Sequence, residues 1–172
     1  NRISDYQRMQ ITNSNFKNTV PVAVEGSFDD CQSAIKDCLA MTPNLYSGNS
    51  VNILRLIAQV IYYFWIAIEF PYGFCVTVPS GNLGNAVAAV IARKMGAPIL
   101  HILIAGNQNL SLNINAPVKE TIETLSTAMD VCKPSNLLRL NYLHPNWNNE
   151  YWISSEIISD TEVKSTIIDT YK

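Results

Sequence analysis

The chain has 172 residues and a mass of 19.2 kDa, which suits one ordinary domain. Twelve basic against fourteen acidic residues leave a net charge of −2, which argues against nucleic-acid binding because such proteins need clustered positive charge. Hydrophobic residues make up 48% of the chain but charged residues only 15%, against about 25% in an average soluble domain. We therefore expect a folded chain with part of its surface covered by further protein, for instance through self-association.

The N-terminal part of the chain predicts one strand and one helix. Residues 1–19 are polar, and we assign them to the remnant of an upstream segment. Residues 20–24 are apolar and β-branched at alternate positions, as in a buried strand. A helix is predicted from Ser27 to about Leu39, because Ser27 and Asp30 have the spacing of a capping box.

A second, longer helix is predicted from Ser50 to Phe70, and Pro71 ends it. Its apolar residues recur at helical spacing, so one broad face is expected to be buried. That face comprises Ile53, Leu56, Ile57, Val60, Ile61, Phe64 and Ile68. The same stretch is interrupted by Arg55 and Gln59 and falls short of the roughly 20 apolar residues of a membrane span, so no membrane partner is expected.

The next segments predict strand, turn, helix and strand in succession. Residues 74–78 form a continuous apolar run, which is typical of an inner strand of a parallel sheet. A tight turn at 79–85 leads into a helix of small apolar residues at 86–95, and a further apolar strand follows at 99–105. The order of elements predicts an α/β fold with a mostly parallel sheet flanked by helices.

The C-terminal part gives weaker signals. A short helix is expected within residues 135–143, and a capping box at Ser159–Glu162 predicts a last helix. We therefore divide the chain into a core at 20–135 and a peripheral segment of helices and loops at 136–172.

The four cysteines, Cys31, Cys38, Cys75 and Cys132, include no C-x-x-C pair, so neither a zinc site nor a disulfide framework is indicated. We expect them to be reduced and the protein to be cytoplasmic. His101 lies within an apolar strand and is expected to be a packed core residue.

The turn at 79–85 is the sharpest chemical feature of the sequence. A glycine-rich turn between a strand and a helix exposes backbone N–H groups at the helix N-terminus, and these groups favour a bound phosphate. Gly81 and Gly84 permit a close approach that a side chain would block. The turn lacks both G-K-[ST] and G-x-G-x-x-G, so it fits neither a nucleoside triphosphate nor a dinucleotide. Taken alone, a G-N-x-G turn is a weak signal and is more often a plain structural turn.

Several motifs, in the same order, resemble those of the threonine synthase family. Residues 22–32 (VAVEGSFDDCQ) resemble the family's E-G-[ST]-F-D-D-C-Q motif, and residues 49–64 resemble its N-S-I-N helix. Residues 78–85 (VPSGNLGN) are similar to its V-P-[TS]-G-N-F-G-D loop, and residues 92–96 to the A-x-K-M-G helix end that follows. Residues 126–136 are similar to its S-P-S-M-D-I and S-N stretch. The resemblance spans most of the chain.

Threonine synthases are pyridoxal-phosphate enzymes of the tryptophan-synthase β-like fold (fold type II), and they convert O-phosphohomoserine and water to threonine and phosphate. The resemblance implies a cofactor-phosphate site and a site for a phosphorylated amino acid. The implied cofactor-binding residues are Ser80, Gly81, Asn82, Leu83, Gly84 and Asn85. The implied substrate-binding residues are Asn49, Ser50, Asn52 and Arg55. A guanidinium suits a substrate phosphate, although Arg55 taken alone also fits a solvated arginine on a helix face.

Departures from the family pattern concern the catalytic residues. The family's Schiff-base lysine lies in an F-K-D motif, which does not occur here, and the lysines of this chain lie in none of the matched catalytic contexts. Leu83 replaces the usual aromatic residue and Asn85 replaces an aspartate. The resemblance therefore implies the central portion of a threonine synthase, inactive as this isolated chain. The alternatives are a truncated or decayed non-catalytic paralogue, or part of a related phospho-lyase with another phosphorylated substrate.

Overall fold

The computed structural model describes residues 5–13, 16–26, 28–49, 51–115 and 120–171. By their contacts these residues form two compact units, Asn1–Tyr46 and Ser47–Lys172, each of which is described by itself. The boundaries at residues 19 and 135 that the sequence suggested remain a prediction.

The first unit contains two helices, α1 (Asp5–Thr12) and α2 (Phe28–Met41). The sequence predicted α2, whereas α1 was not recognised in its polar segment; Ser27, the expected cap of α2, lies outside the described residues. The strand predicted at 20–24 is wrong: this segment forms no strand, and Val20 is 82% exposed. Alternation fits a pleated chain, but a strand also needs a neighbouring strand to pair with.

The second unit has α/β architecture, which confirms the predicted fold class. Its elements are α3 (Ile53–Glu69), β1 (Phe74–Pro79), α4 (Gly84–Lys94), β2 (Ile99–Gly106), the 3₁₀ turn η1 (Thr127–Met129), α5 (Leu137–Leu143), the 3₁₀ turn η2 (Trp147–Asn149), β3 (Ile153–Ile157) and α6 (Asp160–Thr170). A full capping box begins α6, as predicted: Ser159 accepts from the Glu162 amide, and the Glu162 side chain accepts from the Ser159 amide.

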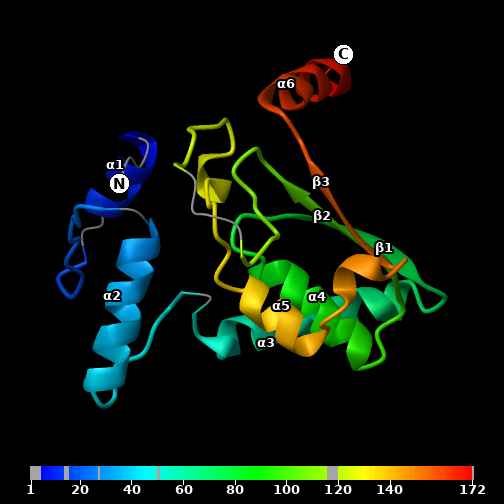
Figure 1. The fold of residues 1–172 in the computed structure, drawn as a ribbon, viewed down its shortest axis with the longest axis horizontal. Coiled ribbons are helices and arrows are strands. Elements are labelled where there is room, and N and C mark those ends of the chain that lie inside the picture. The colour runs from blue at the N-terminus through cyan, green and yellow to red at the C-terminus, as the bar shows by residue number, and fades with distance from the viewer. Residues whose placement is uncertain (1–4, 14–15, 27, 50, 116–119, 172) are drawn as a thin grey trace. The chain divides into compact units, whose positions relative to one another are not determined.

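The three strands form a parallel sheet in the order β1-β2-β3 (Figure 1). Strand β2 is therefore central, and β1 lies at an edge with Cys75 and Thr77 exposed. The prediction that residues 74–78 form an inner strand is wrong for the part of the chain that the structure describes. The sequence also did not predict β3, whose residues pair with Ile102–Gly106 of β2.

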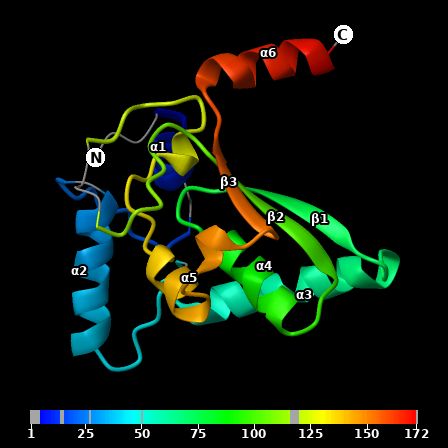
Figure 2. The same cartoon turned by 45° about the vertical axis from the view of Figure 1, so that its right-hand side comes forward.

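Helix α4 forms the centre of the unit. It packs on β2 on one side and on α3 on the other, so α3 and α4 lie on the same side of the sheet (Figure 2). Six of its residues are fully buried: Ala86, Val87, Ala88, Ala89, Val90 and Ala92. Because these side chains are small, a sheet and a second helix can both approach the α4 backbone closely.

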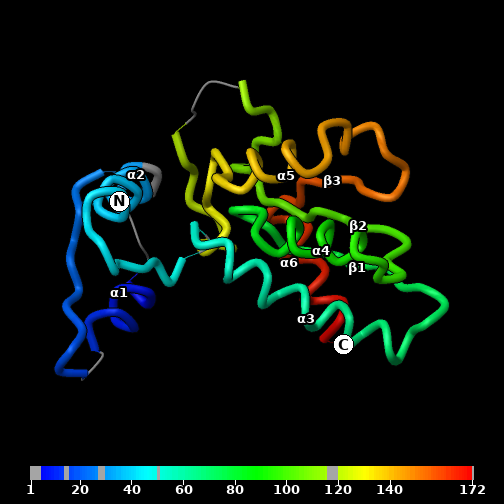
Figure 3. The backbone as a smooth tube through the Cα atoms, turned by 90° about the horizontal axis from the view of Figure 1, so that it is seen from below, coloured from blue at the N-terminus to red at the C-terminus, as the bar shows by residue number. Residues whose placement is uncertain are grey.

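Helix α3 runs along one margin of the unit (Figure 3). Its Asn52 cap accepts a hydrogen bond from the Leu54 amide. Only Leu56, Val60 and Tyr63 of this helix are buried. The predicted broad buried face is therefore wrong in extent: α4 covers a narrow stripe, and Ile53, Ile57, Ile61 and Ile68 are exposed.

Three further properties bear on function. Cys31, Cys38, Cys75 and Cys132 are free thiols. Among the described residues, no helix is long and apolar enough to cross a membrane. The same residues contain no cluster of three or more side chains that would ligate a metal.

Candidate functional site

The glycine-rich turn connects the carboxyl end of β1, at Pro79, to the first residue of α4, Gly84. This strand–turn–helix connection is the one the sequence predicted. The Ser80 amide donates to the Ala105 carbonyl at 2.8 Å and continues the ladder between the strands, so the expectation of an unpaired amide is wrong at this residue.

Four other amides of the turn are available for a ligand. Within the described parts of the chain, the N–H groups of Gly81, Leu83, Gly84 and Asn85 donate to no acceptor. Leu83 has φ 59° and ψ 7°, a left-handed conformation, and right-handed helix begins at the next residue. Successive left- and right-handed residues direct neighbouring N–H groups to one side, which forms an anion-binding concavity. The positive end of the α4 dipole adds to that preference.

The conformation of Leu83 is costly for a residue with a side chain, by about 1–3 kcal/mol. Its side chain is only 1% exposed and belongs to the hydrophobic core, which holds the backbone in this conformation. Packing of the core therefore positions the free amides.

One side of the turn is covered by the backbone of η1. A Cβ atom added to Gly81 would lie 2.8 Å from the Cα atom of Met129, which is closer than such atoms approach. Gly81 is buried and its neighbours Asn82 and Gly84 are half-buried. The η1 backbone therefore closes the turn on the side of Gly81.

The η1 segment is held by the carboxylate of the residue that follows it, Asp130. Its Oδ1 accepts from Asn107 Nδ2 at 2.7 Å, Asn109 Nδ2 at 2.9 Å and Thr124 Oγ1 at 2.7 Å. Its Oδ2 accepts from the Thr124 amide at 3.2 Å. A buried polar network of this kind is stabilising when each member has a partner, and it fixes the backbone that covers Gly81.

On another side the turn is held by the two residues that precede α5 (Leu137–Leu143). Oδ1 of Asn82 accepts from the backbone N–H and the hydroxyl of Ser135, at 2.6 and 3.0 Å. The Asn82 carbonyl accepts from Asn136 Nδ2 at 2.9 Å. The Arg139 guanidinium then donates to Oδ1 of Asn136 and to the carbonyl of Val51. This chain of contacts joins the turn to the N-terminal end of α3.

A second connection between the turn and α3 passes through Asn85. Its Oδ1 accepts from the Tyr63 hydroxyl at 2.7 Å, and its Nδ2 donates to Gln59 Oε1 at 2.9 Å. Burial raises the pKa of Tyr63, and the neighbouring Tyr62 raises it further. Tyr63 therefore stays neutral and remains a hydrogen-bond donor over the physiological pH range.

The predicted substrate-binding residues lie at the start of α3, where they organise the backbone. Asn52 caps the helix and also donates through Nδ2 to the Ser47 carbonyl at 3.2 Å. Oδ1 of Asn49 accepts from the Val51 amide at 3.3 Å, and Nη1 of Arg55 donates to the Gly48 carbonyl at 2.9 Å. Ser50 lies outside the described residues. The substrate role of this segment stays a prediction.

Sequence reasoning missed the residues that connect the two predicted sets. Arg139 was not predicted, because a single arginine on a short helix belongs to no recognisable motif. Tyr63 and Ser135 both fall within segments that resemble family motifs, but those motifs do not indicate a contact with the turn. Only the folded chain brings Ser135 to Asn82 and Tyr63 to Asn85.

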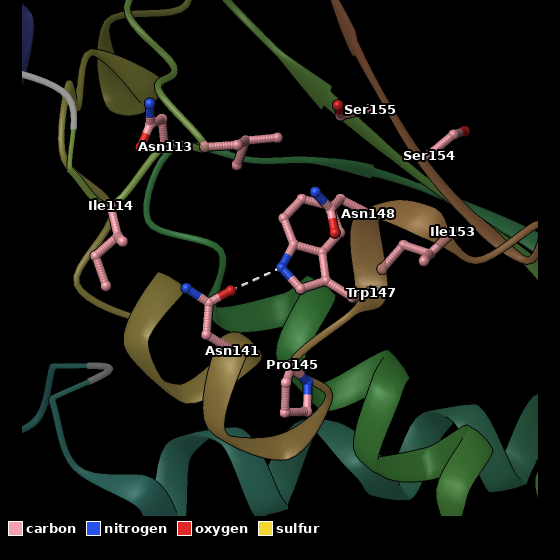
Figure 4. Close-up of a pocket in the computed structure, with 10 residues that line it drawn as sticks. Asn113, Ile114, Asn141, Pro145, Trp147, Asn148, Ile153, Ser154 and Ser155 are labelled. Carbon is pink, nitrogen blue, oxygen red and sulfur yellow. Dashed lines mark hydrogen bonds between the residues drawn. The ribbon is translucent and has the colours of Figure 1, made fainter.

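A cavity of about 650 Å³ lies elsewhere in the unit, between the 112–114 loop, α5, η2 and β3 (Figure 4). Trp147 forms part of its wall and donates through Nε1 to Asn141 Oδ1 at 2.8 Å. None of the predicted cofactor- or substrate-binding residues lines it.

Comparisons with known proteins identify the relatives of this chain. Threonine synthase from Haemophilus influenzae is 36% identical over 164 residues, which cover 85% of this chain and 38% of that protein. The crystal structure of threonine synthase from Escherichia coli matches with a TM-score of 0.72 and 30% identity, over 87% of this chain and 39% of that one. The structure of pyridoxal-phosphate-bound threonine synthase from Brucella melitensis matches with a TM-score of 0.70 and 26% identity, over 96% of this chain and 44% of that one. No family model matches the chain.

Proposed function

Because this chain is homologous to threonine synthases over most of its length and corresponds to about 40% of theirs, we propose that it is the central portion of a threonine synthase. In this proposal the whole enzyme converts O-phospho-L-homoserine and water to L-threonine and phosphate. The present chain supplies the site for the cofactor phosphate and is inactive by itself.

The observation that carries the proposal is the set of free amides at the start of α4. Leu83, Gly84 and Asn85 offer three successive N–H groups beside the positive end of a helix dipole. This donor set fits a phosphate group. When bound, pyridoxal phosphate supplies an electron sink for chemistry at an amino-acid substrate; the protein residues named here bind and orient it.

The N-terminal end of α3 is the proposed binding region for the substrate phosphate. The contact of Arg55 to the Gly48 carbonyl uses Nη1 alone among the described residues, so Nη2 and Nε remain available for a phosphate oxygen. Hydrogen bonds of Arg139 and Asn136 join this region to the turn. A small phosphorylated amino acid is the ligand class that these donors suit.

Inactivity of the isolated chain is proposed because no lysine lies in a matched catalytic context. Lys94 belongs to the last turn of α4, at the opposite end of the helix from the free amides, and its amino group donates to the Leu143 carbonyl. A non-catalytic paralogue, or part of a phospho-lyase with another phosphorylated substrate, is the alternative that the departures at Leu83 and Asn85 favour.

The proposed phosphate site is tested with pyridoxal phosphate and inorganic phosphate as probes. We expect weak, reversible binding of pyridoxal phosphate, with competition by inorganic phosphate and chemical-shift changes at the amides of residues 83–85. Asn82→Asp places a negative charge at the turn and should weaken both ligands by roughly tenfold. Asn149→Asp in η2 makes the same charge change and should leave binding unchanged.

Two results would refute the parts of this proposal separately. Equal binding by the two aspartate variants, or no competition by phosphate, would refute the phosphate site. Phosphate release from O-phosphohomoserine above background, or borohydride trapping of the cofactor on one specific lysine, would refute the inactivity of the isolated chain.

A further inference from the structure

The peptide between Asn82 and Leu83 contributes one donor to the candidate phosphate site, the N–H of Leu83. A trans peptide is planar, and its carbonyl and its N–H point in opposite directions. The Asn82 carbonyl points towards Asn136, whose Nδ2 donates to it at 2.9 Å. The Leu83 N–H of the same peptide therefore points away from Asn136, and within the described residues it donates to no acceptor.

A half-turn of this peptide would remove the donor. Rotation about the axis that joins the two Cα atoms exchanges the carbonyl and the N–H, which is the difference between turns of types I and II. It would direct the Asn82 carbonyl to the side where the Leu83 N–H lies now, and an oxygen there repels a phosphate. The same rotation would take φ of Leu83 out of the left-handed region, which is costly for a residue with a side chain. The observed orientation therefore needs a partner that holds it.

Asn136 is that partner, and Arg139 determines which way its carboxamide faces. Asn136 is 0% exposed, so both ends of its carboxamide need hydrogen bonds. The Arg139 guanidinium donates to Oδ1 of Asn136. Because a guanidinium has donors only, the oxygen end of the carboxamide must face it and the Nδ2 end must face the turn. The Asn82 carbonyl then meets a donor, as observed.

Arg139 is held from its other side by the start of α3. Nη2 of Arg139 donates to the carbonyl of Val51, which directly precedes the Asn52 cap of α3. The position of the guanidinium therefore depends on the region that is proposed to bind the substrate phosphate. Order in that region and the orientation of the peptide at 82–83 are linked through two side chains, those of Arg139 and Asn136.

We propose that Arg139 and Asn136 are positioning residues of the phosphate site. They hold the Leu83 N–H towards the ligand, against a rotation that would relieve the left-handed conformation of Leu83. Neither side chain touches the ligand, because both act through the peptide at 82–83. The ligand in this inference rests on the proposed function, whereas the orientation of the peptide is measured without any ligand.

Asn136→Asp tests the orientation directly. The aspartate keeps an acceptor for Arg139 but offers no donor to the Asn82 carbonyl. Rotation of the peptide would bring the Leu83 N–H to the new carboxylate in a charge-assisted hydrogen bond, so we expect the rotated peptide. The three-bond coupling between the amide and α protons of Leu83, which depends on φ, should change in the ligand-free protein. Binding of inorganic phosphate should weaken by roughly tenfold or more.

Asn141→Asp on α5 is the matched control. It adds the same negative charge and keeps the oxygen that accepts from Trp147 Nε1. The Leu83 coupling should stay as in the unaltered protein, and phosphate affinity should change by less than about threefold. An unchanged coupling in Asn136→Asp, or the same change in both variants, would overturn the proposal.

The part of Arg139 is tested by the polarity of its replacement, which also decides the matter if Asn136→Asp does not fold. Arg139→Gln has an acceptor as well as donors, so it no longer dictates the orientation of the Asn136 carboxamide and should change the Leu83 coupling. Arg139→Lys has donors only and should restore the coupling. Arg93→Gln removes a guanidinium that donates to the Ile99 carbonyl from the last turn of α4, and it should leave the coupling unchanged.

Two outcomes separate this inference from the proposed function. If Arg139→Gln is folded by circular dichroism and has the Leu83 coupling of the unaltered protein, Arg139 is not a positioning residue and the inference is overturned. If the unaltered protein binds no phosphate while the coupling responds as expected, the proposed phosphate site is refuted and the hold on the peptide stands.

Discussion

One carboxamide oxygen, Oδ1 of Asn82, accepts hydrogen bonds from both the amide and the hydroxyl of Ser135, at 2.6 and 3.0 Å. The two residues are 53 positions apart in the sequence. The Asn82 side chain therefore connects the turn before α4 to the segment that precedes α5. The glycine-rich turn is therefore a local loop that also makes a tertiary contact with a distant part of the chain.

Removal of this acceptor should destabilise the protein. Asn82→Ala leaves the partly buried amide of Ser135 without a partner, and we expect a loss of about 1–3 kcal/mol in the free energy of unfolding. Asn82→Asp keeps an acceptor oxygen and should retain most of that stability. Urea denaturation of the three proteins measures the difference. Equal stability of the alanine and aspartate variants would contradict the role of the acceptor.

The close approach of Gly81 to η1 predicts that this glycine does not tolerate a methyl group. In Gly81→Ala the new Cβ would lie 2.8 Å from Met129 Cα, so the covering backbone must shift, and overpacking of this kind costs about 1–3 kcal/mol. Gly48→Ala is the matched control, since nothing lies within 4 Å of the added atom. The midpoint temperature of thermal unfolding should be higher for Gly48→Ala than for Gly81→Ala. The reverse order would show that η1 does not cover the turn.

The contact between Tyr63 and Asn85 predicts a pH-dependent effect on stability. Tyr63→Phe removes the donor to Asn85 Oδ1 and should cost about 1 kcal/mol. Because the pKa of Tyr63 is raised in the folded protein, this contribution is complete below the ordinary tyrosine value of 10.0 and is lost as the pH rises towards the folded-state pKa.

Tyr72→Phe is the control for that measurement, because Tyr72 is 99% exposed and the substitution should leave stability unchanged. Urea denaturation of both variants at neutral pH and above pH 10 measures the two contributions. A Tyr63→Phe effect that grows at high pH would mean that the hydroxyl is ionised in the folded protein, contrary to the burial argument.

Local signals in the sequence account for the parts of the fold that were predicted. The apolar runs of β1 and β2, the glycines of the turn and the cap of α6 each act over a few neighbouring residues, and each gave the correct element type. Strand β3 was missed because Ile153–Ile157 contains two serines and a glutamate and becomes a strand by pairing with β2.

The extent of burial could not be read from periodicity. Apolar residues occur on all sides of α3, so their spacing does not show which face of the helix α4 covers. In the candidate site, the turn was predicted from Gly81 and Gly84, whereas its support by Ser135 depends on a contact across 53 positions that no local pattern encodes.

The cap of α6 gives a last prediction, concerning acid. The Ser159 hydroxyl donates to Glu162 Oε2 at 2.6 Å and the Ser159 amide donates to the same oxygen at 2.8 Å. These hydrogen bonds, led by that of the hydroxyl, hold the pKa of Glu162 below the ordinary value of 4.5. Because the folded-state pKa is lowered, the stabilisation of α6 is present above pH 4.5 and is lost as the pH falls through the folded-state value.

Substitution of the capping serine tests whether the capping box lowers the pKa of Glu162. Ser159→Ala removes the hydroxyl and should raise the pKa of Glu162 towards 4.5. Ser165→Ala removes a hydroxyl of the same helix that donates to the Glu162 carbonyl and not to its carboxylate, so it should leave that pKa unchanged. NMR titration of the Glu162 side chain measures both. The same carboxylate pKa in Ser159→Ala as in the unaltered protein would show that the capping box does not hold this end of α6 in solution.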